Sequence, residues 1–440
     1  MSILNLSKKL LECNEYIAQL EEKNRLLNEN INLTAQKPDC DARAKYEQRK
    51  MAYLLPIREM SAYISSTYEF RHNVVRNSYD YRLRLTDDDR TTAGTQQWQP
   101  IDERQLNTIL SSVQDDGNVF CLKSLVVQRI KSEMASEFHP VTSYLKQLRG
   151  TWDGQDRVAD LAARINSSDY CLKMLHVWLR AMVAQWMGSN AAHANAVMLL
   201  LVSQRQGLHK STFMRELLPP ELRDYYTDDF SLSSRGNAER KLVEFALVNI
   251  DEFDKLPQRR MPDLKTLMQT MRPSFVRAYK SNFNSLPRIA SFVGTSNQRQ
   301  LLTDRTGSRR FLILEPQDVI NVADIDHRQL YAQLMSEVEN GEQSYFTKNE
   351  ERQMQLVNAS YYVKTPLEQL FSEFFRAPRQ TDDESEVKRL SAAQLMTLLA
   401  SHQRSILRCV SETTFGTMLR HMGIPREHTN TGNLYRVVAC

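Results

Sequence analysis

The sequence first suggests chemistry in a short polar run, Lys210, Ser211 and Thr212. The run follows an apolar segment and precedes a stretch with helical periodicity. A loop that binds nucleotide phosphates needs such a lysine for the phosphate charge and a hydroxyl group that can bind Mg²⁺. Gly207 supplies one flexible position, but Gln204 and His209 stand where such loops usually carry glycine. Because His tolerates a positive φ better than most residues, we expect the loop to close, with strain and weaker nucleotide affinity.

Two adjacent carboxylates, Asp251 and Glu252, end a second apolar run about forty residues after this loop. An aspartate at the end of a strand can bind Mg²⁺ directly or through water. The neighbouring glutamate can act as the general base that activates a water molecule. An apolar run that ends in Asp-Glu is common by itself, so the prediction of a metal site depends on the loop upstream.

A third apolar run ends in a polar amide, Asn297, which would reach the terminal phosphate or the attacking water. Arg309 and Arg310 follow shortly afterwards, beside a Thr-Gly-Ser turn. An arginine that reaches the nucleotide of a neighbouring subunit neutralises charge in the transition state. Each feature alone is compatible with a polar surface turn. Their order, with each at the end of a strand, favours one composite site.

Parallel strands are the elements that would bring these side chains together. Short apolar runs bounded by polar residues are typical of buried parallel strands, and helical stretches lie between them. We therefore predict an α/β fold with a parallel-sheet core. The four expected strands lie in the runs 196–202, 242–251, 288–297 and 309–315.

The first 34 residues carry apolar side chains in steps of three and four, with Asn24 on the same stripe. This heptad pattern predicts a coiled coil over 1–34, in which a single polar residue fixes register and oligomeric state. The alternative is one amphipathic helix packed on its own protein. The following stretch, 34–45, has the composition of a linker.

The rest of the chain divides by composition and periodicity. We expect a mixed α/β domain over 45–137, with two short strands around Asn77 and helices over 103–136. Basic and aromatic residues alternate there, which suits nucleic acid, although a solvated strand face explains the pattern better. The other expected regions are a helical collar over 138–195, the sheet core over 196–345, a helical extension over 346–376, a linker over 377–388 and a small, basic, winged-helix-like domain over 387–440, with Arg404, Arg408, Arg420, Arg426 and Arg436.

The composition sets limits on the class of protein. The 440 residues include 41% hydrophobic and 25% charged residues, with a net charge of +4. These values are typical of a globular protein and compatible with a nucleic-acid partner. No stretch approaches the roughly 18 apolar residues that a membrane span needs. The six cysteines are scattered, which argues against a zinc site or disulfide framework and leads us to expect a cytoplasmic protein.

The run from about 139 to 315 resembles the virulence-associated protein E family of phages and mobile elements, which is similar to superfamily 3 ring helicases of the AAA+ type. The stretches that carry the resemblance are HPVTSYLKQLRGTWDGQDRV, MLLLVSQRQGLHKSTF, NIDEFD, RAYKSNFNSLPRIASFVGTSN and DRTGSRRF. Glycine is usual in the family where Gln204 and His209 stand. The C-terminal fifty residues resemble a small domain often appended to the family.

The resemblance implies a set of roles. Gly207, His209, Lys210, Ser211 and Thr212 would bind ATP, with Ser211 and Asp251 binding Mg²⁺. Glu252 would be the general base and Asn297 the sensor, and Arg309 or Arg310 the arginine finger. A hairpin between them would contact DNA in a ring pore through Arg277, Tyr279 and Lys280, although Arg277 or Tyr279 supporting the sheet is an equal alternative.

The first functional hypothesis is an ATP-driven helicase or translocase on single-stranded or forked DNA. It would form a homo-oligomeric ring, expected to be a hexamer, and act with a primase or another replication protein. The alternative is a non-hydrolysing module that uses nucleotide for assembly or DNA binding, which the two missing glycines favour. Primase activity within 50–137 is disfavoured, because the segment is short and lacks a convincing pair of carboxylates.

Overall fold

The computed structural model describes residues 18–26, 40–84, 97–132, 134–189, 194–232, 235–276, 283–285, 287–303, 306–379, 381–429 and 432–440. The chain forms two compact units, and the boundary between them lies between Phe138 and His139. Within the described ranges, no helix combines the length and the apolar character needed to cross a bilayer. Residues 18–26 are helical and exposed, and the remainder of the heptad stretch lies outside the described residues, so the coiled coil remains a prediction.

The first unit contains a four-stranded sheet of order β3-β2-β1-β4, with α2, α3 and α4 in addition to the helical residues 18–26 in its described sequence. Its elements are α2 (Cys40–Thr67), β1 (Tyr68–Asn73), β2 (Ser78–Leu83), β3 (Gln99–Pro100), α3 (Glu103–Asp115), α4 (Lys123–Ile130) and β4 (Ser136–Phe138). The expected strands around Asn77 are present and pair antiparallel, with Asn73 opposite Ser78. The helix α2 corrects the predicted linker over 34–45, because it already begins at Cys40.

The arginines on the sheet of this unit are held within the protein. Arg71 donates to Asp80 at 2.8 Å, and Arg82 forms an ion pair with Glu69 at 2.6 Å. Both guanidinium groups also stack on the ring of Trp98, each with its central carbon 4.6 Å from the ring centre. Since their charges are already neutralised, these contacts favour the structural explanation of the basic and aromatic pattern over a nucleic-acid face.

The second unit is built on a five-stranded, all-parallel sheet of order β11-β5-β10-β7-β6. The α/β prediction is therefore confirmed. The strands are β5 (Met198–Val202), β6 (Tyr226–Thr227), β7 (Leu247–Ile250), β10 (Ser291–Ser296) and β11 (Phe311–Leu314). The four predicted runs each contain one strand, and the fifth, β6, was not predicted, because two residues give no periodicity to detect.

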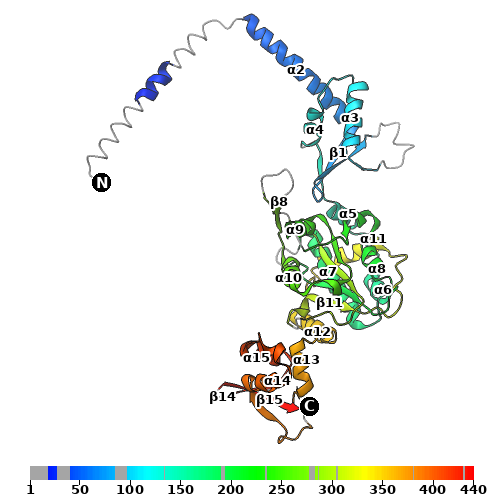
Figure 1. The fold of residues 1–440 in the computed structure, drawn as a ribbon. Helices are drawn as coiled ribbons and strands as arrows, with labels where there is room; N and C mark the ends of the chain where they lie inside the picture. Colours follow the sequence, from blue (N-terminus) through cyan, green and yellow to red (C-terminus); the bar gives the residue numbers. More distant parts are fainter. Residues whose placement is uncertain are drawn as a thin grey trace, which may run out of the picture. The chain divides into compact units, whose positions relative to one another are not determined.

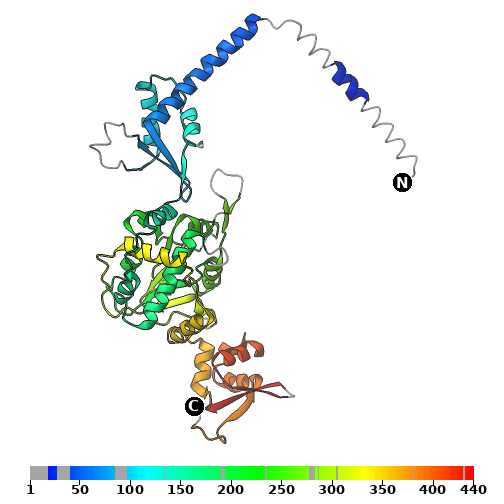
Figure 2. The ribbon, with the colours of Figure 1, turned by 180° about the vertical axis from the view of Figure 1, so that it is seen from behind.

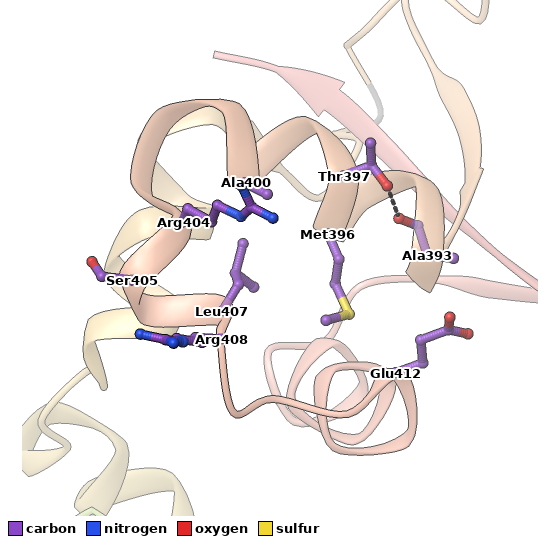
Figure 3. A pocket seen from close by; sticks show the side chains of 9 residues that line it. All are labelled: Ala393, Met396, Thr397, Ala400, Arg404, Ser405, Leu407, Arg408 and Glu412. Carbon is purple, nitrogen blue, oxygen red and sulfur yellow. Dashed lines mark hydrogen bonds between the residues drawn. The ribbon is translucent and has the colours of Figure 1, made fainter.

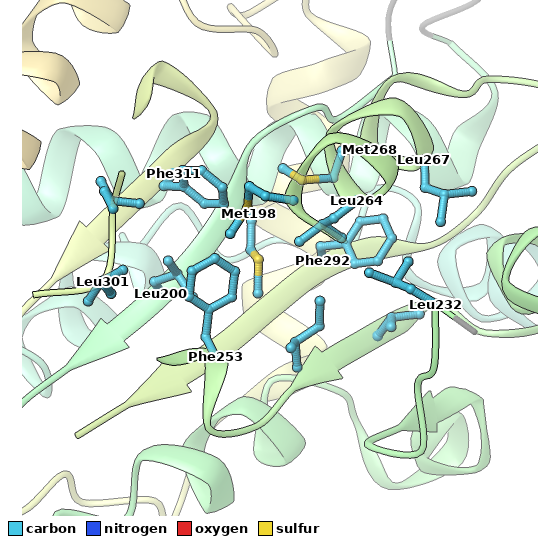
Figure 4. Packing of buried hydrophobic residues seen from close by; sticks show 14 of the residues in the cluster. Met198, Leu200, Leu232, Phe253, Leu264, Leu267, Met268, Phe292, Leu301 and Phe311 are labelled. Carbon is cyan, nitrogen blue, oxygen red and sulfur yellow. The ribbon is translucent and has the colours of Figure 1, made fainter. Parts of the chain in front are cut away.

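Alternate residues of the strands pack under helices on one face of the sheet. Figure 4 shows Met198 and Leu200 of β5 and Phe292 of β10 beside Leu264 and Met268 of α10. Figure 1 shows α9 and α10 on one side of the sheet and α6 and α8 on the other, and Figure 2 shows them from behind. The sheet is therefore buried on both faces, as all-parallel sheets usually are.

Helices precede and surround this sheet. They are α5 (Pro140–Leu148), α6 (Arg157–Ala163), α7 (Asp169–Met187), α8 (Lys210–Glu216), α9 (Arg235–Glu244), α10 (Met261–Gln269), α11 (His327–Glu339) and α12 (Lys348–Asn358). Short 3₁₀ turns are η2 (Pro220–Tyr225), η3 (Phe253–Lys255), η4 (Gln258–Arg260), η5 (Thr306–Arg310) and η6 (Ala359–Tyr361). An antiparallel pair, β8 (Ser274–Val276) and β9 (Phe283–Ser285), lies between β7 and β10 in the chain.

The C-terminal elements share a separate hydrophobic core. They are α13 (Pro366–Phe374), β12 (Phe375–Arg376), β13 (Lys388–Ser391), α14 (Ala392–Leu407), α15 (Glu412–His421), β14 (Arg426–Thr429) and β15 (Gly432–Ala439). Phe371 of α13 packs in this core with Leu399 of α14 and Phe415 of α15. The helix α13 thus packs with the C-terminal elements, although we expected it in a helical extension over 346–376.

Candidate nucleotide-binding site

The phosphate-loop candidate connects strand β5 to α8. Gly207 has a φ of 75°, and His209, which precedes the first residue of α8, has a φ of 59°. A left-handed backbone is uncommon for a residue with a Cβ atom. The loop therefore closes with histidine in a conformation that glycine adopts without strain.

Lys210 points back into the loop and across the edge of the sheet. Its ammonium group donates to the carbonyl oxygens of Ser203 and Arg205, at 3.1 and 3.3 Å, and to Oδ1 of Asn297 at 2.8 Å. Lys210 is 8% exposed. Burial lowers the pKa of its ammonium group from the usual value, while the Asp251 carboxylate acts in the opposite direction. The lysine of the loop and the amide expected as a sensor are thus in direct contact.

Asp251 joins the end of β7 to the start of α8. Its Oδ1 accepts a hydrogen bond from the Ser211 hydroxyl at 2.8 Å and a second from the Thr295 hydroxyl. Ser211 and Asp251 are the two residues expected to hold Mg²⁺, and they are in contact. Thr212, the next residue of α8, is exposed.

Glu252 lies beside Asp251 but faces a different partner. Its backbone has a φ of 51°, and its Oε2 accepts a hydrogen bond from the Lys255 ammonium at 2.6 Å. Both side chains are exposed, with fractions of 49% for Glu252 and 68% for Lys255. Solvent screens an exposed ion pair of this kind, so the carboxylate is held only weakly.

Arg309 and Arg310 lie at the amino ends of the parallel strands, whereas the phosphate loop lies at their carboxyl ends. They end η5 directly before β11, and Phe311 of β11 pairs with Met198, the first residue of β5. The phosphate loop follows the last residue of β5, roughly 16 Å further along the strand at 3.3 Å per residue. Arg309 forms an ion pair with Glu351 at 3.1 Å, whereas Arg310 has no ion-pair partner among the described residues.

The expected DNA-contact residues Arg277, Tyr279 and Lys280 lie outside the described residues. The antiparallel strands β8 and β9 flank this segment, in the place where a hairpin was expected. Buried Arg288 follows the hairpin, and its guanidinium group donates to the carbonyl oxygens of Met268 and Ala290, among others. It thereby ties the end of α10 to the entry of β10. Burial lowers the pKa of Arg288 to about 9.

Sequence reasoning missed three side chains of the site: Thr295, Asp254 and Lys255. Asp254 accepts a hydrogen bond from the Ser296 hydroxyl at 2.7 Å, which fixes the turn after β7 to the end of β10. All three lie within four residues of predicted site residues. Their closeness in the sequence to the predicted site residues could have indicated that they belong to the site. It could not have indicated their hydrogen-bond partners.

The donors present fit a Mg²⁺ ion that is bound together with a nucleotide. In the described part of the chain, no group of three or more His, Cys, Asp or Glu side chains could hold a metal ion alone. Mg²⁺ in nucleotide sites is usually held by one or two protein groups, with waters and phosphate oxygens completing the octahedron. The hydroxyl of Ser211 and the carboxylate of Asp251 match that requirement.

Comparisons with known proteins bear on the identity of this site. No curated protein matches the sequence. Two solved structures, titled the apo structure and the A form apo structure of the NrS-1 C terminal region (305-718), have TM-scores of 0.44 and 0.42 and identities of 10% and 11%. They cover 88% and 87% of this chain, and 99% of each matched chain. Such low scores carry no argument about function.

Two family models match adjacent parts of the sequence. Residues 364–437 match a domain of unknown function from B. theta, DUF3874. Residues 145–363 match the virulence-associated protein E-like domain, which extends beyond the end at 315 expected from the resemblance. That match includes the phosphate loop, the Asp251-Glu252 pair and Asn297, so the protein carries a virulence-associated protein E-like domain at its centre.

Proposed function

We propose that this protein is an ATP-dependent helicase or translocase that acts on DNA in the replication of a phage or mobile element. The observation that carries the proposal is the meeting of Lys210 with Asn297, and of Ser211 with Asp251, at the carboxyl edge of one parallel sheet. Ligands of open parallel sheets bind at that edge. The match to the virulence-associated protein E-like domain supports this proposal.

Lys210 would provide the positive charge for the nucleotide phosphates. Its ammonium group has three donors, and three protein oxygens accept them in this structure. A phosphate oxygen would have to replace at least one of them, and the carbonyl oxygens of Ser203 and Arg205 make the longer contacts. When bound, Mg²⁺ supplies charge neutralisation at the phosphate oxygens. Ser211 and Asp251 would hold it.

Glu252 would take the proton of the attacking water, and Asn297 would orient that water or the terminal phosphate. For this role the Glu252 carboxylate has to leave the ammonium group of Lys255, since a paired carboxylate is a weaker base. Because this ion pair is weak and exposed, separating its two side chains requires little free energy.

The arginine finger would act on a neighbouring subunit. Arg310 and Arg309 lie at the amino edge of the sheet, too far along the strand to reach the phosphate loop of their own chain. A head-to-tail interface that closes into a ring would bring this edge to the next subunit's nucleotide. We assign the finger first to Arg310, because Arg309 is already paired with Glu351.

The remaining assignments are part of the same proposal. Arg277, Tyr279 and Lys280, which follow β8 in the sequence, would contact single-stranded or forked DNA. The helical collar, the winged-helix-like C-terminal region and the N-terminal coiled coil would support a homo-oligomeric ring, expected to be a hexamer. A primase or another replication protein would be its partner.

The test is an ATPase assay with and without single-stranded DNA, with the mass of the assembly measured in the same buffer. We expect hydrolysis that DNA stimulates in the wild type and that both Lys210→Ala and Glu252→Gln abolish. Glu252→Gln should still bind nucleotide, whereas Lys210→Ala should not. Hydrolysis that persists unchanged in Lys210→Ala, or that DNA never stimulates, would contradict the proposal.

The second candidate is a module that binds nucleotide without hydrolysing it. The left-handed backbone of His209 favours this candidate, because a strained loop is expected to bind phosphate less well. The double variant Gln204→Gly/His209→Gly separates the two functions. If only the double variant hydrolyses ATP, the natural protein is the non-hydrolysing module; if both hydrolyse it, the first proposal stands.

A further inference from the structure

The C-terminal elements have the layout of a helix-turn-helix followed by a hairpin. Four residues, 408–411, separate α14 from α15, and the strands β14 and β15 follow α15 and pair antiparallel. The strand before α14, β13, pairs with the other side of β15, which places β15 between β13 and β14. Two helices joined by a turn of three or four residues are a common way to present the second helix to a DNA groove.

The arginines of these elements are of two kinds, paired and unpaired. On the sheet, Arg436 is paired with Glu384 at 2.7 Å, and Arg389 with Glu427 at 3.4 Å. In contrast, four exposed arginines form no ion pair with any residue that the structure describes: Arg404, Arg408, Arg420 and Arg426. Arg389 and Arg436 on the sheet are thus neutralised internally, while positive charge remains available at the end of α14, on α15 and at the start of β14.

Arg404 and Arg408 border a groove between α14 and the start of α15. Figure 3 shows Arg404 coming from α14, Arg408 coming from the residue directly after it and Glu412 coming from α15. The groove has a volume of about 810 Å³, and Met396 and Leu407 lie between the two helices. Because the Glu412 carboxylate repels anions at its side, an anionic strand is favoured on the side of the two arginines.

The outer surface of α15 offers polar groups of a different kind, of which the Thr417 hydroxyl already donates to the carbonyl oxygen of Thr413. Thr413, Thr417 and Arg420 follow one another in steps of four and three, so they share one face of the helix. None of them is buried. Hydroxyl and guanidinium groups bind both phosphate oxygens and base edges. Phe415 and Leu419, on the opposite face, fix α15 to the domain core.

We propose that the C-terminal domain is a binding site for double-stranded DNA, in which α15 enters a groove and the unpaired arginines bind the flanking phosphates. Arg404 and Arg408 contact one strand beside the start of α15, and Arg426 contacts the backbone at the other end. This site is separate from the single-stranded DNA path of the proposed translocase. It would hold the duplex from which that strand is drawn.

The test measures the affinity of the full-length protein for a labelled blunt duplex by fluorescence anisotropy at several salt concentrations. Two double variants remove the proposed contacts, Arg404→Gln/Arg408→Gln and Arg420→Gln/Arg426→Gln. Arg389→Gln/Arg436→Gln is the matched control, since it removes the same charge from the same domain at arginines that are already paired. Thermal unfolding of each variant checks that the domain remains folded.

Each lost phosphate contact reduces the slope of log affinity against log salt by about 0.9. We therefore expect each test variant to lower this slope by about 2 and the control to leave it unchanged. Unchanged duplex affinity in both test variants would overturn the proposal and point to an acidic protein partner for the surface. An equal loss in the control would also overturn it, because net charge alone would then explain binding.

The ATPase stimulated by single-stranded DNA separates this proposal from the function proposed above. We expect the two test variants to retain it, because none of the four arginines lies in the nucleotide site. Duplex binding that is lost while this ATPase persists supports the second site. Duplex binding that is unaffected overturns the second site, whatever the ATPase does.

Discussion

The carboxylate of Asp251 is the residue on which the candidate metal site depends. It accepts hydrogen bonds from Ser211, on the phosphate-loop helix, and from Thr295, on the neighbouring strand. Ser211 would move onto a bound Mg²⁺ together with Asp251, whereas Thr295 would keep its place behind them. Thr295 is therefore a positioning residue for the carboxylate, comparable to the outer groups that orient metal ligands.

We predict that Thr295→Val raises the Mg²⁺ concentration needed for half-maximal ATP hydrolysis by about tenfold, because groups that orient metal ligands typically contribute 10–100-fold. Valine keeps the shape of threonine and removes only the hydroxyl group. The measurement is an ATPase titration with Mg²⁺ at saturating ATP. Ser296→Ala is the matched control, since the Ser296 hydroxyl donates to Asp254 instead. Equal Mg²⁺ requirements in wild type and Thr295→Val would remove Thr295 from the site.

The sequence indicated Lys210, Asp251 and Asn297, because polar residues directly after apolar runs meet at one edge of a parallel sheet. It did not indicate Thr295, although this residue lies only two positions from Asn297. Its contact depends on the side of β10 from which the hydroxyl projects, and on the register with β7. Neither can be derived from the composition of a short run that is buried throughout.

At the scale of elements, β10 connects the two strands that carry the site. It pairs with β5 on one side and with β7 on the other. A Cβ atom at Gly294 would lie 2.8 Å from the carbonyl oxygen of Ile250 and would also meet the end of the Met198 side chain. Gly294 therefore permits the close approach of β10 to β7, the strand that precedes Asp251.

We predict that Gly294→Ala destabilises the protein by about 2 kcal/mol, the usual cost of overpacking a buried site. Urea denaturation of the second unit is the measurement. The comparison of Met198→Ala with Met198→Ala/Gly294→Ala identifies the cause, because Met198→Ala removes the contact with the Met198 side chain and keeps those with the Leu200 side chain and the Ile250 carbonyl oxygen. If Gly294→Ala causes little further loss of stability in the Met198→Ala protein, the contact with Met198 explains the destabilisation and the carbonyl oxygen of Ile250 does not.

The apolar runs predicted four of the five parallel strands, because each run is long enough to show its bounds. They did not predict β6, whose two residues lie at the sheet edge beside β7. They also did not predict α2, where Pro56 and a weak apolar stripe obscure the helical pattern. Tertiary contacts of Met60 and Ile64 stabilise that helix, and these contacts are not encoded within its own segment.

His327 fastens two elements of the second unit together. It is the first residue of α11, and its Nε2 is 2.7 Å from the carbonyl oxygen of Glu216, the last residue of α8. Burial, and then the positive charge of Arg223, lower the pKa of His327 to about 4. The folded protein therefore holds this histidine neutral at a pH at which the unfolded chain protonates it.

We predict that this histidine makes folding stability fall as the pH decreases from about 6.5 towards 4, because the unfolded chain then binds the extra proton. Above pH 7 its contribution does not change with pH. The measurement is the urea midpoint between pH 7.5 and 5 for wild type and His327→Gln, whose amide can still donate to Glu216. The variant should show a flatter pH dependence, and identical profiles would exclude His327 as a source.

At the scale of the whole molecule, the two edges of the parallel sheet carry complementary halves of one proposed site. Lys210, Asp251 and Asn297 are at the carboxyl edge, and Arg310 precedes β11 at the amino edge. Within one chain these halves cannot meet, because the length of β5 separates them. Activity should therefore require contact between subunits, and hydrolysis should increase more steeply than protein concentration where the assembly dissociates.

Mixing two inactive variants tests this arrangement directly. We predict that Lys210→Ala and Arg310→Ala are each inactive alone and that an equal mixture regains about a quarter of the wild-type rate, because a heterologous interface pairs the intact loop of one subunit with the intact arginine of the next in that share of contacts. The ATPase rate after mixing, under conditions that allow subunits to exchange, is the measurement. Arg309→Ala alone and mixed with Lys210→Ala decides between the two arginines. Only the variant that lacks the arginine finger should be inactive alone and regain activity in the mixture. If no mixture regains activity while mass measurement shows that subunits have exchanged, neither arginine acts across the interface and the proposed ring site is wrong.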